Sequence, residues 1–359
     1  MSLAIPAHLR HILDLARWAP SGDNTQPWRF DVLGDEHVLV HGLDTRDHVV
    51  YDLDGHASQL AVGALLETLV IAATTQGRRT EISRRADTPE THLLLDVRFT
   101  PDGALVADPL AGCIEKRVVQ RRPMSLRPLT HQQKSALESA LPEGFRVLWF
   151  EGASLRWRLA KLMFDNAKIR LTIPEAYKVH RSVIEWGARF SEDRIPDQAV
   201  GVDPVTARLM RWVMASWERV EFFNSYFLGH LPPRIQLDLL PGLFCAAHFA
   251  LLRETPPLRV DDYLASGRAM QRFWLTAASL GMFLQPEMTP VIFSRYVRQN
   301  RRFTRNRTAV ELATKLSLSM QALLDAQELD SIFFMGRMGA GPAPVSRSTR
   351  KPLDRLMAG

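Results

Sequence analysis

The sequence predicts an α+β protein built from two related halves of unequal length. Three observations support this prediction. Helical and strand patterns follow one another along the 359 residues. Two long apolar segments, one early and one late in the chain, resemble each other closely. A chain of this length can form two domains, or two lobes that share one large core.

The first elements are a helix, a polar loop and a hairpin. Leu9, Ile12 and Leu15 have helical spacing, which predicts a helix over residues 8–18, and Pro20 then stops it. Gly34 and Asp35 mark a turn between two β-rich runs. The expected strands of this hairpin cover residues 28–33 and 37–41.

An internal repeat joins the two halves. Residues 63–77 and 267–281 are both largely apolar, and glycines bracket both at the same spacing. An acid or amide stands at the fifth position of each, Glu67 and Gln271. A helix that is apolar nearly all round must be buried, and a closing glycine suits a C-terminal cap with positive φ. An internal repeat of this kind is expected when a half-domain has been duplicated.

The turns near Pro109 separate the halves, so we place the first half at residues 1–110 and the second at 111–359. The first half adds a strand at 92–99. The second half contains an insertion of about 155–242, rich in Trp and Met at helical spacing, which we interpret as core helices or as a lid. The other strands expected in the second half lie near 146–150, 243–251 and 331–335.

The polar loop over residues 19–28, with the sequence APSGDNTQPW, lies between the first helix and the first strand. Its Ser and Asn side chains and free backbone N–H groups could bind a polar heteroaromatic ring. An ordinary connection rich in turn-forming residues is the alternative interpretation.

Basic segments supply candidate anion contacts. Arg117 and Arg121 are two of four basic residues within a stretch of seven and could converge on one anion, since the planar guanidinium donates two parallel hydrogen bonds to a phosphate. A second basic segment covers residues 346–351. The first segment could instead be a solvated basic loop, and the second a disordered basic tail. After the second apolar helix, we expect an exit loop that contains Gln285 and Pro286.

Taken together, these motifs resemble those of the flavin-dependent nitroreductase family, whose loop pattern is APSxxNxQPW. The resemblance covers most of residues 8–100, 110–130, 240–290 and 330–356 and is poor across the insertion. It implies a nitroreductase-like fold in which two fused half-domains form a pseudo-dimer with central antiparallel sheets flanked by helices. Tandem relatives of this kind include flavin-sequestering proteins and proteins labelled for molybdopterin biosynthesis.

The resemblance also implies a set of cofactor-binding residues. The loop residues would face the flavin ring, two arginines of the second half would meet the phosphate, the exit loop would lie beside the reactive edge of the ring, and two C-terminal arginines would complete the phosphate site. These residues are Pro20, Ser21, Gly22, Asn24 and Gln26, then Arg117 and Arg121, then Gln285 and Pro286, and finally Arg347 and Arg350.

The second half has no second copy of the loop motif, so we expect one FMN per chain in a pseudo-dimeric monomer, with further self-association left open. The resemblance implies an oxidoreductase that takes hydride from NAD(P)H and reduces a small-molecule substrate. No side chain stands out as a catalytic acid, base or nucleophile, since the flavin would carry the chemistry. The alternatives are a flavin-sequestering protein with a lidded site and a basic, nucleic-acid-associated protein.

Composition limits the remaining classes of function. The net charge of +6 comes mainly from arginine, but no nucleic-acid-binding module accompanies it, so we expect no nucleic-acid partner. Cys113 and Cys245 provide neither a disulfide framework nor metal-ligand spacing, and we expect no metal and a cytoplasmic location. The apolar run at 239–252 is too short to span a bilayer, so we expect no membrane partner. Cys245 and His248 are expected to be core residues.

Overall fold

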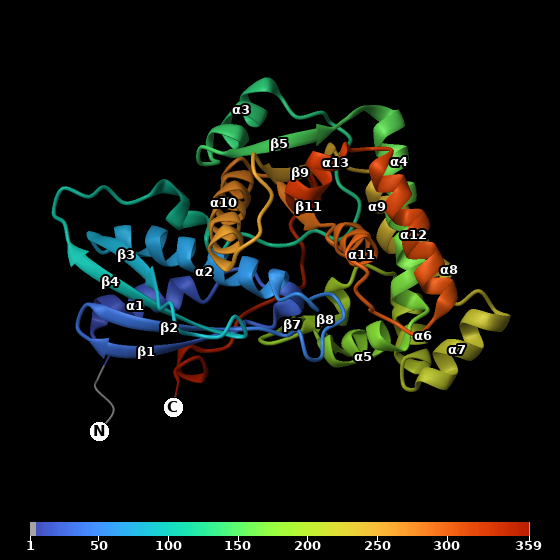
Figure 1. Cartoon of the computed structure of the whole chain (residues 1–359), viewed down its shortest axis with the longest axis horizontal. Helices are drawn as coiled ribbons and strands as arrows, with labels where there is room; N and C mark the ends of the chain where they lie inside the picture. The colour runs from blue at the N-terminus through green and yellow to red at the C-terminus, as the bar shows by residue number, and fades with distance from the viewer. Residues whose placement is uncertain (1–4, 359) are drawn as a thin grey trace.

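The computed structural model describes residues 5–358, which form two four-stranded sheets around a central pair of helices (Figure 1). The strand order is β1-β2-β4-β3 in the first sheet and β10-β11-β9-β5 in the second, and every neighbouring pair is antiparallel. Helices cover both sheets. The prediction of an α+β fold with antiparallel sheets flanked by helices is therefore confirmed.

The first half follows the predicted order of elements with one addition. Helix α1 (Ala7–Ala16) ends four residues before Pro20, and the predicted hairpin is β1 (Trp28–Gly34) with β2 (His37–Leu43). The expected third strand is β4 (His92–Pro101). The sequence analysis missed β3 (Arg78–Arg84), because its inward residues are only half-buried and its polar alternation lacks an apolar face.

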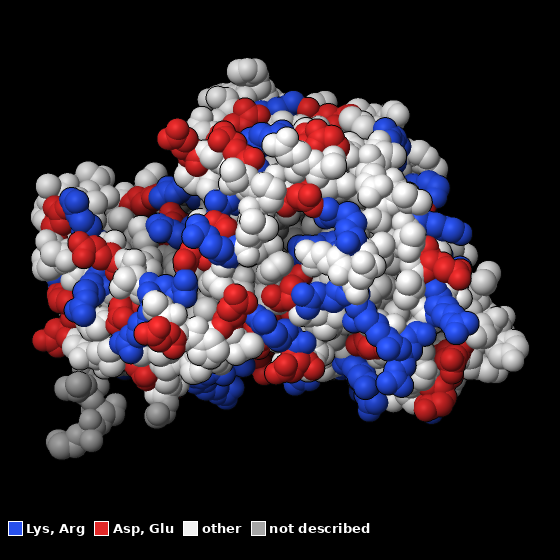
Figure 2. Space-filling model, viewed as in Figure 1, with Lys and Arg blue, Asp and Glu red and all other residues white. Residues whose placement is uncertain are grey.

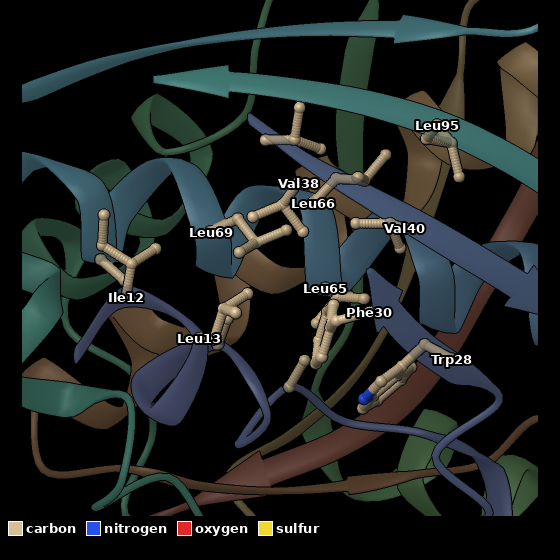
Figure 3. Packing of buried hydrophobic residues seen from close by; sticks show 14 of the residues in the cluster. Ile12, Leu13, Trp28, Phe30, Val38, Val40, Leu65, Leu66, Leu69 and Leu95 are labelled. Atoms are coloured by element: carbon tan, nitrogen blue, oxygen red, sulfur yellow. The ribbon is translucent and has the colours of Figure 1, made fainter. Parts of the chain in front are cut away.

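The core of this half lies between the hairpin and the helices α1 and α2 (His56–Thr74). Figure 3 shows Phe30 of β1, Val38 of β2 and Leu65 of α2 directed toward one another, and all three side chains are fully buried. Leu13 of α1 closes the cluster from the other side. Burial of such side chains stabilises the half by about 1.5–3 kcal/mol each.

The two apolar helices of the repeat cross at the centre of the molecule (Figure 1). They are α2 and α10 (Val260–Ser279), and each begins earlier than predicted, so Gly63 and Gly267 lie inside the helices rather than at their starts. The contact is reciprocal. A Cβ added to either glycine would lie 2.9 Å from the Cα of the other and would collide with a backbone carbonyl of the facing helix. The glycines are therefore required for close approach of the two backbones.

The closing glycines behave as predicted. Gly77 and Gly281 have φ values of 59° and 71°, the left-handed conformation expected after a helix. Among the described residues, α2 alone is long and apolar enough to cross a membrane, but most of it is buried inside the protein. We therefore assign α2 to the shared core.

The second half contains the second sheet and the helices that cover it. The strand predicted near 243–251 begins only at Ala247, because residues 240–243 continue the preceding helical segment and Gly242 packs closely against Ala160. The strand predicted near 331–335 extends four residues further. The elements are α3 (His131–Ser139), β5 (Phe145–Phe150), β9 (Ala247–Arg253), β10 (Phe283–Pro286), α11 (Thr289–Arg298), α12 (Arg307–Gln321), α13 (Ala326–Ser331) and β11 (Ile332–Gly339).

The insertion is mainly helical, as predicted, and its parts are buried to very different degrees. Met163 belongs to the core, but Trp157 and Trp212 are more than half exposed, so the expectation that its aromatic residues form core holds only in part. Its elements are α4 (Gly152–Leu171), α5 (Pro174–Val183), β6 (Ile184–Glu185), β7 (Phe190–Ser191), β8 (Ile195–Pro196), α6 (Pro204–Val213), α7 (Trp217–Tyr226), α8 (Leu231–Arg234), a π-helical turn (Ile235–Leu239) and α9 (Leu240–Leu243).

Each sheet is extended at one edge by a distant segment. The C-terminal segment reaches back to the first sheet, where Met357 bridges to Phe30 of β1 (Figure 1). In the second sheet, Val119 bridges to Leu284 of β10. The division at residue 110 stays a prediction, since the last residues of the chain pack in the core of the first half.

Positive charge is unevenly distributed on the surface. Figure 2 shows Lys and Arg gathered around α11 and α5, whereas both signs mix over the first sheet. Arg301, Arg302 and Arg305 of the basic run between α11 and α12 are exposed. These three arginines therefore lie on the solvated surface.

Candidate functional site

The polar loop between α1 and β1 has an unusual backbone. Asp23, Asn24 and Gln26 have φ values of 50°, 62° and 51°, which is uncommon for residues other than glycine. The Ser21 hydroxyl accepts a hydrogen bond from the backbone N–H of Gln26 at 3.0 Å and fixes the turn. A loop that holds three such residues is over-determined by its surroundings, as is typical of functional sites.

The side chains of Asn24 and Gln26 bind the insertion. The Asn24 amide donates to the carbonyls of Glu192 (3.1 Å) and Arg194 (3.3 Å), and the Gln26 amide donates to the Glu192 carbonyl at 2.8 Å. Directly before Glu192, strand β7 pairs with β12 (Arg347–Ser348). The insertion therefore covers the polar loop and is attached to it and to the C-terminal segment.

Three of the predicted arginines form one cluster beside the end of α1. Arg117 donates to the Trp18 carbonyl at 2.9 Å, and Arg350 donates to the Ala19 carbonyl at 3.1 Å. The guanidinium of Arg347 lies 5.1 Å from the Trp18 ring centroid and donates to the Arg117 carbonyl at 3.3 Å. We call Arg117, Arg347 and Arg350 the arginine cluster.

The arginine cluster carries positive charge with little compensation. Within residues 5–358 none of the three forms an ion pair, although Glu115 acts weakly on Arg347. Burial, and then the charges of Arg350 and Arg347, lower the pKa of Arg117 well below its ordinary value. Burial and Arg347 lower the pKa of Arg350 to about 9. Because a guanidinium keeps its proton in proteins, these shifts indicate a site that favours an anion.

Arg121 lies apart from the arginine cluster. Its guanidinium donates to the Ala199 carbonyl of the insertion at 3.3 Å, and its charged neighbours are Asp23 and Arg337. Burial lowers the pKa of Arg121 to about 10, against the opposing effect of Asp23. Arg117 and Arg121 thus donate to different segments, Arg117 to the end of the first helical region and Arg121 to the insertion, and their convergence on one anion stays a prediction.

Gln285 and Pro286, which were predicted to lie in an exit loop, instead end strand β10, which follows α10 and pairs with β11; we keep the name exit loop for these two residues. The Gln285 amide donates to the Pro286 carbonyl at 2.9 Å, while its carbonyl oxygen is buried without a hydrogen-bond partner in the described chain. Glu287, the next residue, is 1% exposed and binds Arg337 of β11 at 2.9 Å. In the β10–β11 ladder Gln285 stands opposite Arg337.

A small cavity lies beside the polar loop. It has a volume of about 50 Å³, and Asp23 and Tyr51 are among its lining residues. Burial raises the pKa of Asp23, with Arg121 and Arg170 acting in the opposite direction. A wider surface hollow of about 250 Å³ is lined by Glu175 and residues 302–305, and no predicted site residue contributes to it.

Buried polar atoms without partners gather around this region. Such atoms are costly to bury and point to a group that satisfies them. Across residues 5–358 these atoms also occur elsewhere, but many belong to the predicted segments or their direct neighbours. Those at the site are Trp18 Nε1, Asn24 Oδ1, Arg117 Nε, Gln285 Oε1, Arg337 Nε, Ser346 Oγ and Arg347 Nε.

The structure thus distributes the predicted residues over three neighbouring positions: the polar loop, the arginine cluster and the exit loop. Sequence reasoning missed Asp23, Glu287 and Arg337. Asp23 stands within the loop motif at a position the motif leaves free. Arg337 could have been noticed as a lone charge in an otherwise apolar strand.

Comparisons with known proteins bear on the same segments. Residues 6–61, which include the polar loop, match the model of the "Nitroreductase family". A Mycobacterium tuberculosis protein named "Putative NAD(P)H nitroreductase" is 33% identical over 290 residues, which cover 79% of this chain and 76% of that protein. An uncharacterized M. tuberculosis protein is 30% identical over 183 residues, and the match spans about half the length of each chain, 50% and 52%.

Two solved structures are similar at greater distance. A nitroreductase-like family protein from Bacillus cereus has 12% identity and a TM-score of 0.34, with 70% of this chain and 95% of that chain covered. A BluB-like flavoprotein from Clostridium difficile has 10% identity and a TM-score of 0.37, with 70% and 99% covered. At these identities and TM-scores, the two similarities give no information about the site.

Proposed function

The chain belongs to the nitroreductase family, and from that premise we propose that it is an oxidoreductase that binds one FMN, accepts hydride from NAD(P)H and reduces a small organic molecule. The family is flavin-dependent, which supports the coarser assignment as a flavin oxidoreductase. The choice of FMN and of a pyridine nucleotide rests on the residues at the site and on the relative's name.

The arginine cluster is the observation that carries the proposal. Arg117 and Arg350 are 4% and 8% exposed, they repel each other, and neither has a carboxylate partner among residues 5–358. A phosphate monoester would neutralise this charge and accept a hydrogen bond from the unpartnered Nε atom of Arg117. FMN has such a phosphate at one end and a flat polar ring at the other.

The remaining residues fit the ring. The polar loop and the exit loop both contribute side-chain amides to the proposed ring site. The side-chain oxygens of Asn24 and Gln285 are buried without hydrogen-bond partners in the described chain. Such oxygens can accept from the N–H of an isoalloxazine, and guanidinium N–H groups can donate to its carbonyls. When bound, FMN would supply the hydride-transfer chemistry, and these side chains would orient it and exclude water.

A second function is favoured by one specific observation, the cover over the polar loop. The cavity there measures about 50 Å³, whereas ligand pockets are usually several hundred Å³. The ring enters only when residues 190–199 of the insertion move, and these residues are tied to Asn24, Gln26 and Arg121. If the cover closes again over a bound ring, the protein would sequester flavin with little turnover.

Anaerobic addition of NADPH to the FMN-loaded protein tests both functions, with NADH in a parallel run. Bleaching of the visible flavin band, followed by its return when a nitroaromatic or quinone is added, is the result expected of an oxidoreductase. Tight FMN binding without bleaching by either nucleotide would favour sequestration. A protein that cannot be loaded with FMN would contradict both.

We further propose that the chain acts as a pseudo-dimeric monomer on a small-molecule substrate. The reciprocal contact between Gly63 and Gly267 supports this, since it places two related helices as two subunits of a symmetric dimer would place them. A mass near 40.6 kDa by light scattering is the expected result. A mass of twice that value would indicate further self-association.

A further inference from the structure

We propose that His248, Glu287 and Arg337 hold one buried unit of positive charge beside the flavin ring and thereby make the bound cofactor easier to reduce. The inference rests on the proposed function, since it concerns the same site. It assigns a role to three side chains that the motif resemblance does not reach, and we call them the buried triad.

The buried triad is a continuous chain of short contacts. His248 Nδ1 lies 2.7 Å from one oxygen of Glu287, and the other oxygen of Glu287 lies 2.9 Å from Nη1 of Arg337. None of the three side chains is more than 2% exposed. The charges are therefore separated from solvent and little screened by salt.

Hydrogen-bond geometry fixes the charge on the imidazole. His248 Nε2 lies 2.8 Å from the Gly242 carbonyl oxygen, and Nδ1 faces a carboxylate, so both ring nitrogens face acceptors. An imidazole that donates from both nitrogens is protonated. Burial works to lower the pKa of His248, but Glu287 and, after it, Cys245 raise it to about 10. Two cations and one carboxylate leave one net positive charge.

The triad reaches the site through Arg337. Its Nη2 donates to the Arg121 carbonyl at 2.9 Å, its Nε is buried without a partner, and Gln285 of the exit loop stands opposite it in the ladder. Glu287 directly follows Gln285 and Pro286 in the chain. Arg337 is therefore the member able to touch the ring, while His248 and Glu287 are positioning residues that act through it.

A buried charge of this kind favours the reduced cofactor. A hydride brings two electrons and one proton, so the ring gains one negative charge on reduction. A fixed positive charge nearby stabilises that form and leaves the neutral oxidised ring almost unaffected. Stability of the fold alone does not require the triad, because well-packed apolar residues commonly replace buried ion pairs without loss.

The test is a redox titration of the FMN-loaded protein and of His248→Gln, which removes the imidazolium. We expect the variant to lose about tenfold in its preference for reduced over oxidised FMN, equivalent to about 30 mV lower potential for a two-electron couple. A merely structural role would weaken binding of both forms equally and leave the potential unchanged.

His180→Gln is the matched control. His180 bonds to the Tyr51 hydroxyl at 2.8 Å, and burial together with Arg170 lowers its pKa to about 3, so it is neutral and its removal changes no charge. Its potential should equal that of the unaltered protein. Equal potentials for His248→Gln and the unaltered protein would overturn the inference, even though both bind FMN.

Two further measurements keep the inference testable if His248→Gln does not fold. Arg337→Gln removes one charge from the other end of the triad and should lower the potential in the same direction. The unaltered protein should bind reduced FMN more tightly than oxidised FMN. Tighter binding of oxidised FMN would overturn the inference, whereas failure to bind either form would instead contradict the proposed function.

Discussion

Two groups of charged side chains that contain buried arginines differ in how their charge is balanced. In the arginine cluster, Arg117 and Arg350 donate hydrogen bonds to backbone carbonyls, Arg117 also stacks on the Trp274 ring, and other arginines lie nearby. In the buried triad, Arg337 binds Glu287, whose carboxylate is shared with His248. Arg117, Arg350 and all three residues of the triad are buried, whereas Arg347 is half-buried.

The difference separates a binding site from a supporting structure. A buried cation without a carboxylate costs folding free energy and is retained where a ligand supplies the missing charge. In the buried triad one carboxylate balances one of two cations, and the positive charge that remains acts on local geometry and potential. We therefore expect changes in the arginine cluster to alter ligand affinity, and changes in the buried triad to alter stability.

The largest expected effect is on FMN affinity in the double variant Arg117→Ala/Arg350→Ala. Each charge-assisted hydrogen bond to the phosphate contributes about 1.5–3 kcal/mol, so the dissociation constant should rise by roughly 10²–10⁴-fold. Fluorescence titration with FMN measures it. Arg302→Ala/Arg305→Ala, which removes two exposed arginines, is the matched control and should bind FMN normally.

The same double variant sharpens the comparison when studied without FMN. Because the arginine cluster has no carboxylate partner, its removal should leave the free energy of unfolding of the apoprotein unchanged or raised. Urea denaturation followed by tryptophan fluorescence measures this. A marked loss of apoprotein stability would contradict the assignment of a ligand site.

In the buried triad, Glu287→Ala should lower the free energy of unfolding by about 3–5 kcal/mol, because it leaves two buried cations without a partner. The control is Glu311→Ala, which removes an exposed carboxylate on α12. Equal urea midpoints for the two variants would show that the triad does not balance its charges as described.

The triad should also make stability depend on alkaline pH. The folded-state pKa of His248 is about 10, above the unfolded value of about 6.5. Its stabilisation is therefore fully present below about pH 6.5 and is lost as pH rises toward 10. Stability profiles of the unaltered protein and His248→Gln should diverge below pH 10 and converge above it. Parallel profiles would contradict a protonated His248.

The smallest expected effect uses inorganic phosphate as a probe of the arginine cluster. At ten times its dissociation constant, an anion that binds only the folded protein stabilises it by about 1.4 kcal/mol. Thermal unfolding of the apoprotein should therefore shift upward with phosphate at constant ionic strength. The shift should be absent in Arg117→Ala/Arg350→Ala. An equal shift in both proteins would indicate a nonspecific salt effect.

Local patterns in the sequence were enough to predict several parts of the fold and the site. The helix α1, the β1–β2 hairpin and the apolar character of α2 and α10 follow from spacing and turn residues over short stretches. The polar loop and the basic segments were identifiable because each is contiguous in the chain. Whether they bind FMN stays a prediction.

Contacts between distant segments could not be predicted in the same way. Gly63 and Gly267 were read as helix ends, because only the crossing of α2 and α10 shows that they permit backbone contact. Arg117 and Arg121 share one segment, yet they face different neighbours. The assembly of Arg117 with Arg347 and Arg350 depends on a C-terminal segment more than 200 residues away in the chain.

The sequence by itself determined which side chains are available: the amides of the polar loop, the arginines of two basic segments and a lone His248 in an apolar run. The tertiary structure decided which charges are balanced. Charge balance in a protein interior depends on distances of a few ångströms between residues far apart in the chain. Because the interior has low polarisability, each ion pair there has a large effect on the free energy. That is why the arginine cluster and the buried triad, which both contain buried arginines, differ in chemistry.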